Sequence, residues 1–392
     1  MNQKSSRTGL FFIVTAMFWF SNYAYIPTFT PYLKSEGISY AMIGTIGGAY
    51  GLAQLVLRVP IGIASDRLGK RKIFIILGTV LGTVSSLLLF TTTNPVMIWM
   101  FRFLSGASAS MWVVYTVLFS SYFEDGKAAS RISLLGIANT GGMLLAKMTG
   151  SLAAESYGYR SAFLLSAAVG AAAVVLSLFV KENVPKSQEK PSIKELLSVV
   201  KNRNLIVMSV LAIFSQMAMF ATINTFTPEA AAELGADSLQ QGFLSTLSSI
   251  PALFAAMLLG WLFAKKVNLR FLVSFSMLLG AAGSVITAFA GSLAMVYIGS
   301  VVAGLGFGLT MNSLMSHCTL TVDPRYRSVA MGFYQAIYSI GMFLGPMIVG
   351  AVAELSGIQE GILFAAALSL AGMLLSVWLL RPVNNSQFII HN

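Results

Sequence analysis

Long apolar segments separated by short polar connections run through the whole chain. Each is about 20 residues or longer, the length that a helix needs to cross a bilayer. Hydrophobic residues lie all round each segment, without the alternation of barrel strands, so helices are favoured. We predict twelve spans, at residues 9–32, 41–64, 73–92, 96–120, 131–154, 160–180, 204–227, 240–264, 270–290, 294–319, 328–353 and 358–380.

The longest polar stretch, residues 181–203, divides the twelve spans evenly. It is rich in lysine and contains two prolines, which is typical of a linker. We therefore expect an N-terminal six-helix bundle at 1–180, a cytoplasmic linker at 181–203, and a C-terminal six-helix bundle at 204–392 that ends in a short cytoplasmic tail. Within the linker, Ile193–Val200 is predicted to form a short helix on the membrane surface.

Composition supports an all-α polytopic membrane protein. Hydrophobic residues make up 56% of the chain and charged residues 10%, against about 25% charged in ordinary globular proteins. Soluble and disordered chains are both excluded by these figures. A single cysteine, Cys318, and two histidines, His317 and His391, leave little for a metal site. We expect no cofactor.

The net charge of +11 does not indicate nucleic-acid binding, because the basic residues are spread between apolar segments. Their distribution predicts orientation instead, since cytoplasmic loops are rich in Lys and Arg. With a cytoplasmic N-terminus, only Lys34 and Arg160 fall outside, while Arg58, Arg102 and Lys147 lie within spans. Both termini are therefore expected in the cytoplasm, and the protein in a bacterial cytoplasmic membrane.

The two halves of the sequence resemble each other at a nearly constant offset. Thr28–Pro31 reads Thr-Phe-Thr-Pro and recurs as Thr225–Pro228, 197 positions later; Gly142 and Glu155 recur as Gly341 and Glu354, 199 positions later. Six helices per half give both halves the same orientation. The duplication thus predicts two bundles related by a pseudo-twofold axis along the membrane normal, with a substrate site between them near the midplane.

The loop after span two contains Gly62, Asp66, Arg67, Gly69 and Arg71. This pattern, Gly-x-x-x-Asp-Arg-x-Gly-x-Arg, resembles the loop between spans two and three of the major facilitator superfamily. Together with twelve spans and the duplication, the resemblance covers the whole chain. It implies alternating access and a gating contact between Asp66 and the start of span eleven in the outward-open state. The alternative is that the loop's cations only set topology.

Span four carries Arg102, which is similar to the Arg-x-x-x-Gly motif of drug:proton antiporters in this superfamily. In span five, Lys147 stands where efflux members have a proline, and the proline is found in span eleven at Gly345-Pro346. Charged residues at such depth usually face a protein interior or a water-filled cavity. Arg102 either binds solute or bonds backbone carbonyls to stabilise the bundle. Lys147 either presents its charge to the cavity, or extends its amine to the outer membrane interface, or bonds backbone carbonyls.

The acidic residues lie in loops or at span ends; Glu229, for example, is placed just after span seven. We therefore expect no carboxylate deep in a helix. A cavity shared by Arg102 and Lys147 favours an anionic or zwitterionic solute, because a positive cavity repels cations. Lys147, unlike arginine, is able to release its proton, which makes it a candidate proton carrier.

Polar and aromatic residues of the spans that line or flank the centre in this superfamily complete the predicted cavity. For each residue taken alone, helix packing is the stronger explanation. The predicted solute or coupling residues besides the two cations are Asn22, Tyr25, Trp112, Tyr115, Asn139, Asn224, Asn312, Tyr334 and Tyr338.

Three functions remain open, and none is enzymatic, because the sequence has no Walker loop and no nucleophile paired with a base. The first is proton-driven export of a small amphipathic compound, drug-like or an endogenous metabolite such as a metallophore. The second is import or exchange of organic anions. The third is a lipid flippase or a transporter-derived sensor. The expected partners are a small solute, protons and membrane lipids, and we expect a monomer.

Overall fold

The computed structural model describes residues 3–123, 128–182, 199, 201–255, 267–320, 322–323 and 326–380. All regular structure in these ranges is helical. The predicted surface helix at Ile193–Val200, most of the linker and the end of span eight lie outside the described residues.

The first half contains α1 to α8. The first span is formed by α1 (Gln3–Tyr23) and α2 (Ile26–Ser35), and the fourth by α5 (Pro95–Ser110) and α6 (Trp112–Ser120). The other helices of this half are α3 (Tyr40–Leu68), α4 (Arg71–Thr91), α7 (Ala128–Tyr157) and α8 (Ser161–Ser177).

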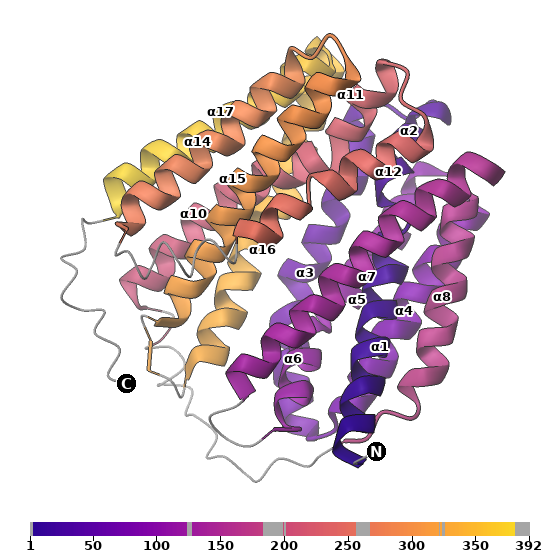
Figure 1. Ribbon diagram of the computed structural model, residues 1–392, viewed down its shortest axis with the longest axis vertical. Coiled ribbons are helices and arrows are strands. Elements are labelled where there is room, and N and C mark those ends of the chain that lie inside the picture. The colour runs from indigo at the N-terminus through magenta and orange to yellow at the C-terminus, as the bar shows by residue number, and fades with distance from the viewer. Residues whose placement is uncertain are drawn as a thin grey trace.

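The second half contains α10 to α17. Its first span comprises α10 (Arg203–Ala221), a π-helical turn η1 (Thr222–Phe226) and α11 (Thr227–Glu233). The others are α12 (Ser238–Leu247), α14 (Leu269–Ala288), α15 (Leu293–Leu320), α16 (Arg327–Ser356) and α17 (Ile358–Leu379). In Figure 1 the two halves form separate groups of helices, indigo to magenta and pink to yellow.

Nine helices or helix pairs of the described residues are long and apolar enough to span a membrane. With α7, α8 and the α12 segment they form the twelve-helix architecture of two related six-helix bundles, as predicted. The first and seventh spans break at equivalent places, at Tyr25 and at Thr222, 197 positions apart. The Thr-Phe-Thr-Pro repeats therefore follow matching breaks in the two halves.

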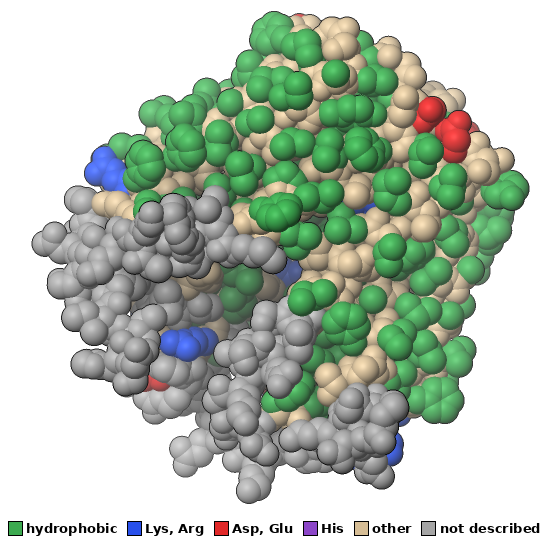
Figure 2. Space-filling view, viewed as in Figure 1, with side chains coloured by type: hydrophobic (Ala, Val, Ile, Leu, Met, Phe, Trp, Pro, Cys, Tyr) green, Lys and Arg blue, Asp and Glu red, His purple; other side chains and the backbone are tan. Residues whose placement is uncertain are grey.

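The halves meet most extensively at two helix pairs, α3 with α16 and α7 with α12, and α2 adds contacts with α11 and α12. We call the end of the bundle that carries Tyr40 and Ser238 the closed end, because the halves touch there. The opposite end, where α1 and α4 begin, is the open end. A Cβ placed on Gly62 or Gly332, near the open end of α3 and α16, would meet no described atom within 4 Å. Figure 2 shows the surface hollowed near its centre, with a basic side chain visible in the hollow.

One sequence prediction about this architecture is wrong. Glu229 was placed after span seven, but α11 continues that span to Glu233, and Glu229 is only 5% exposed. Pro228 lies near the first position of α11, where no backbone N–H is needed. The seventh helical segment therefore holds a buried carboxylate, four residues from its end.

Candidate functional site

Arg102 lies in the first half, beside a cavity to which both halves contribute. Its side chain is 6% exposed, and its Nη1 donates hydrogen bonds to the Tyr25 hydroxyl at 2.9 Å and to Ser105 Oγ at 3.2 Å. The guanidinium carbon lies 4.4 Å from the ring centroid of Tyr50, and farther from the rings of Tyr25 and Phe29. These three rings form an aromatic cage that stabilises the cation.

The cage is held by hydrogen bonds among neighbouring helices. Ser105 donates to Asn22 Oδ1 at 3.1 Å, and Asn22 donates to the Phe18 carbonyl and to Ser108 Oγ. Arg102 Nε is buried without a partner. Among the described residues, no ion pair joins Arg102 to a carboxylate. A buried cation without a counter-ion is costly, so this arrangement favours the arrival of an anion.

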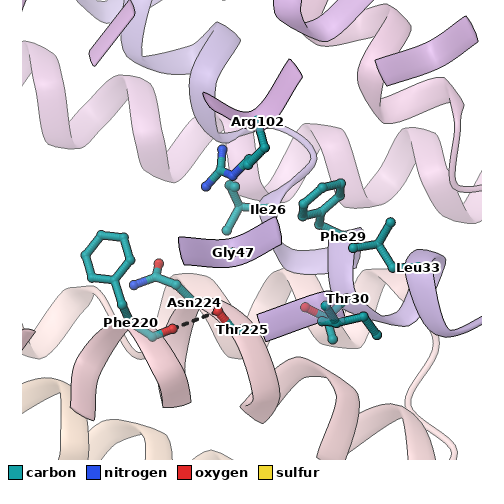
Figure 3. Close-up of a pocket in the computed structure, with 10 residues that line it drawn as sticks. Ile26, Phe29, Thr30, Leu33, Gly47, Arg102, Phe220, Asn224 and Thr225 are labelled. Atoms are coloured by element: carbon teal, nitrogen blue, oxygen red, sulfur yellow. Dashed lines mark hydrogen bonds between the residues drawn. The ribbon is translucent and has the colours of Figure 1, made fainter. Parts of the chain in front are cut away.

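A small cavity lies beside Arg102 and is lined by both halves. Its volume is about 10 Å³, close to the room that one water molecule needs. Its lining residues are Ile26, Phe29, Thr30, Leu33, Ile43, Gly47, Arg102, Phe220, Asn224 and Thr225. Figure 3 shows Arg102 on one side and Asn224, with Phe220 and Thr225, on the other.

Asn224 reaches this position because it lies in the π-helical turn η1. Thr225 Oγ1 donates to the Phe220 carbonyl at 2.8 Å, just before this turn. π-Helical turns are rare and occur often at functional sites. The turn thus brings an amide of the second half opposite the cation of the first.

Arg58 is a second buried cation, which the sequence reasoning counted but did not assign to the site. It is 4% exposed, it bonds Gln54 Oε1 through Nη2, and its Nη1 reaches the Tyr338 hydroxyl at 3.3 Å and the Gln335 carbonyl at 3.4 Å. These contacts cross from α3 to α16. The available signal was a charge inside an apolar span, four residues after Gln54.

Lys147 lies between α7 and α12 and is 2% exposed. Its amine donates to the Ser245 carbonyl at 3.0 Å and to Ser249 Oγ at 2.7 Å. This matches the alternative of a carbonyl-bonded lysine, and Lys147 does not line the cavity beside Arg102. The small residues of α12 bring its backbone close enough for the lysine to reach it, which the sequence of span five alone does not reveal.

An aromatic ring lies near each of the two cations. The Lys147 amine lies 5.9 Å from the Tyr23 ring centroid, while Arg102 lies over the Tyr50 ring.

The other predicted solute residues take different positions. Tyr115 and Trp112 stack on each other in an aromatic core with Phe11 and Phe18. Asn312 bonds the Gly308 carbonyl of its own helix, and Asn139 Oδ1 is buried without a partner. Tyr334 is fully buried and packs edge-on against Tyr338. Three of the predicted solute residues lie near a buried arginine. Tyr25 bonds Arg102, Asn224 lines the cavity beside Arg102, and Tyr338 bonds Arg58.

The predicted gating residues lie at the two ends of the bundle. Asp66, with a side chain 68% exposed, pairs with Arg71 at 3.5 Å. Gly69 ends α3 in the left-handed region at φ 64°, which forms the expected sharp turn. Arg67 is exposed at the open end, and a Cβ on Gly62 would meet no described atom within 4 Å. Pro346 packs against Gly47, while Gly345 packs against the Met217 backbone.

Membrane-length helices in two related halves, with cations buried where the halves meet, define a membrane transporter that works without covalent chemistry. A sequence profile of the major facilitator superfamily matches residues 11–228 and 208–388. The chain belongs to the major facilitator superfamily, whose members are transport proteins and not enzymes.

Two curated relatives and a solved structure are similar over most of their length. The chain is 25% identical to an uncharacterized MFS-type transporter of Methanocaldococcus jannaschii, over 88% of this chain and 90% of that one. It is 24% identical to the quinolone resistance protein NorA of Staphylococcus aureus, over 89% and 90%. A bacterial homologue of the human lysosomal transporter Spinster, solved inward-facing and occupied, matches with a TM-score of 0.83 at 14% identity, covering 98% of each chain.

Proposed function

We propose that this transporter moves a small amphipathic organic compound that carries an anionic group, either as an anion or as a zwitterion. The observation that carries the proposal is Arg102, buried in an aromatic cage and bonded to hydroxyl groups. The carboxylate of a solute would supply the missing counter-ion. Charge-assisted hydrogen bonds of this kind are about twice as strong as neutral ones.

The surroundings of Arg102 suit the rest of such a solute. Phe29 and Phe220 offer apolar surface, and Asn224 offers an amide from the opposite half. A solute held between Arg102 and Asn224 contacts both halves at once. Because its contacts change when the halves move, binding is coupled to the change of access.

We further propose that the open end faces the cytoplasm of a bacterial cell, with both termini on that side. The support is the concentration of Lys and Arg in the connections at that end. The conformation described here is then inward-open, ready to accept solute from the cytoplasm.

For direction, we propose export. NorA is a quinolone resistance protein, and resistance conferred by a transporter is consistent with removal of drug from the cytoplasm. The solute is then drug-like or an endogenous metabolite such as a metallophore. Import or exchange of organic anions is the second candidate, because the buried cations favour an anion whichever way it moves. A lipid flippase ranks below both.

Protons are the proposed driving force, and the structure adds a carrier to the one expected from sequence. Lys147 remains one candidate. The other is the newly recognised buried carboxylate Glu229, whose Oε2 has no hydrogen-bond partner. Lys147→Arg keeps the charge but cannot release a proton; Glu229→Gln keeps the shape but cannot bind one. Whichever variant retains solute exchange but loses its dependence on a pH gradient identifies the carrier.

The test is transport by the purified chain in proteoliposomes. Labelled aromatic carboxylates, zwitterionic quinolones and lipophilic amines are supplied with and without a pH gradient. We expect the carboxylates and zwitterions to move and the amines to be excluded, and we expect the gradient to drive accumulation. Preferential movement of the amines would contradict the proposal.

A further inference from the structure

A groove of about 650 Å³ lies at the open end, far from Arg102 in the fold. It is lined by the start of α1, the start of α4 and the segment that follows α8. Its residues are Arg7, Lys72, Leu178, Phe179, Val180, Lys181 and Glu182. The groove therefore combines three cations with apolar side chains at a level where the helices end.

The segment after α8 is held in place by three contacts. Lys72 Nζ donates to the Leu178 carbonyl at 2.6 Å, and the Tyr122 hydroxyl donates to the Lys181 carbonyl at 2.6 Å. Val180 is 2% exposed and packs in the aromatic core of the first half. The groove is thus built by the fold.

Its charge is only partly neutralised. Glu182 is the one acid among the lining residues, and its carboxylate accepts the backbone N–H of Arg71 at the start of α4. A carboxylate at that position stabilises the helix N-terminus, so Glu182 interacts with the backbone of α4. Arg7 Nε is buried and has no hydrogen-bond partner. The groove therefore offers a net positive charge and an unused donor.

An apolar strip begins beside these cations. Leu178 and Phe179 are exposed in the groove, and Ile73, Leu77 and Val175 are exposed along the neighbouring faces of α4 and α8. α4 and α8 pack against each other. In Figure 2 hydrophobic side chains cover much of the flank to which α8 belongs in Figure 1. A molecule that fills the cationic groove and also covers the apolar strip needs an anionic head and long apolar tails.

We propose that this groove binds one anionic phospholipid, with the phosphate among Arg7, Lys72 and Lys181 and the acyl chains along α4 and α8. Basic pockets at membrane-facing helix ends have the chemistry for anionic headgroups, and two candidate spans begin at this groove, at Arg7 and Arg71. Lys72 follows Arg71, the partner of Asp66, so the lipid would rest beside the loop after span two. The proposal does not depend on which solute is transported.

The test uses the full chain in detergent, titrated with phosphatidylglycerol, phosphatidylcholine or glycerol 3-phosphate and followed by native mass spectrometry and thermal unfolding. We expect one phosphatidylglycerol to bind and raise the unfolding temperature more than phosphatidylcholine does. The triple variant Arg7→Gln/Lys72→Gln/Lys181→Gln should bind it about 100-fold more weakly. The control Arg160→Gln/Arg203→Gln/Arg270→Gln removes equal charge elsewhere and should bind as the wild type.

Lys181 is exposed, so the single variant Lys181→Glu keeps the test decisive if the triple variant does not fold. It should weaken phosphatidylglycerol binding about tenfold and leave phosphatidylcholine binding unchanged. Equal affinity for the two lipids, unchanged binding by Lys181→Glu, or equal stabilisation by glycerol 3-phosphate would each overturn the proposal. The last result would assign the groove to a free phosphate compound.

Discussion

The two largest interfaces between the halves are equivalent in the repeat but differ in their stabilising contacts. At α3–α16, Gly44 packs against Pro346 and Gly350; at α7–α12, Gly242 packs against Lys147 and Ser151. The members of each matching pair are 198 or 199 positions apart. In both interfaces a side chain on the glycine would overlap atoms of the facing helix. The facing helices therefore approach each other closely at a glycine in both interfaces.

The matching continues at the closed end. Glu354 of α16 accepts the Tyr40 N–H at 2.7 Å, and Glu155 of α7 accepts the Ser238 N–H at 2.9 Å. Tyr40 and Ser238 are the first residues of α3 and α12. Each half therefore supplies a carboxylate to a helix N-terminus of the other half, where the unpaired N–H groups and the helix dipole favour a negative charge.

The interfaces differ at one position. Pro346, which has no backbone donor, occupies in α16 the place that Lys147 occupies in α7. α3–α16 is joined at this level by packing alone, whereas α7–α12 gains the two hydrogen bonds of Lys147. The comparison indicates that Lys147 acts first as a contact that keeps the closed end shut. Proton coupling through Lys147 therefore requires that its hydrogen bonds to Ser245 and Ser249 break.

The largest effect is expected from filling the glycine contacts. Gly44→Leu and Gly242→Leu should each prevent closure, because overpacking costs about 1–3 kcal/mol, a factor of about 5–150 in the population of the closed state. We expect nearly complete loss of transport in both. Distances between spin labels across the closed end should lengthen. Closure retained in only one variant would show that the interfaces are not equivalent.

Removing the lysine amine should have a smaller effect, confined to one interface. Lys147→Met removes the two hydrogen bonds of the amine, and the loss of hydrogen bonds from a charged group costs about 1.5–3 kcal/mol. Labels across α7–α12 should report a larger open fraction than labels across α3–α16. Pro346→Ala is the matched control, and it should leave the α7–α12 distances unchanged. Identical opening at both interfaces would remove the special role of Lys147.

The smallest effect is expected from the carboxylates. Glu354→Gln and Glu155→Gln should each loosen closure by about 0.5–2 kcal/mol, the range for loss of a helix cap. Because the two contacts lie on different interfaces, their effects should add in the double variant. Hydrogen exchange at the first turns of α3 and α12 measures each effect separately. If one single variant speeds hydrogen exchange in the first turns of both α3 and α12, the contacts of Glu354 and Glu155 are not independent.

Much of this architecture could be predicted from the sequence. Span lengths follow directly from hydrophobicity, and the constant offset of the Thr-Phe-Thr-Pro repeats gave the symmetry. The position of Glu229 could not be predicted from hydrophobicity alone. The apolar run ends before this residue, but Pro228 lies at the start of a further helix, α11, which carries Glu229.

The candidate site was less predictable, because its contacts join residues far apart in sequence. Arg102 and its neighbour Tyr25 were named from the spans to which they belong. The partners of Lys147 lie about 100 positions away, and its sequence neighbours give no indication of which helix it meets. Arg58 was noted within its span, but its contacts with Gln335 and Tyr338 depend on the packing of α3 against α16.

The central claim is that Arg102 recognises an anionic group of the solute. The most direct measurement is counterflow in proteoliposomes of a quinolone with a free carboxylate and of its methyl ester, by wild type and Arg102→Ala. A hydrogen-bonded charge is worth about 1.5–3 kcal/mol, so the wild type should exchange the free acid about 10- to 150-fold faster than the ester, and Arg102→Ala should lose that preference. Equal exchange of the two compounds by the wild type, or a preference that persists in Arg102→Ala, would contradict the claim.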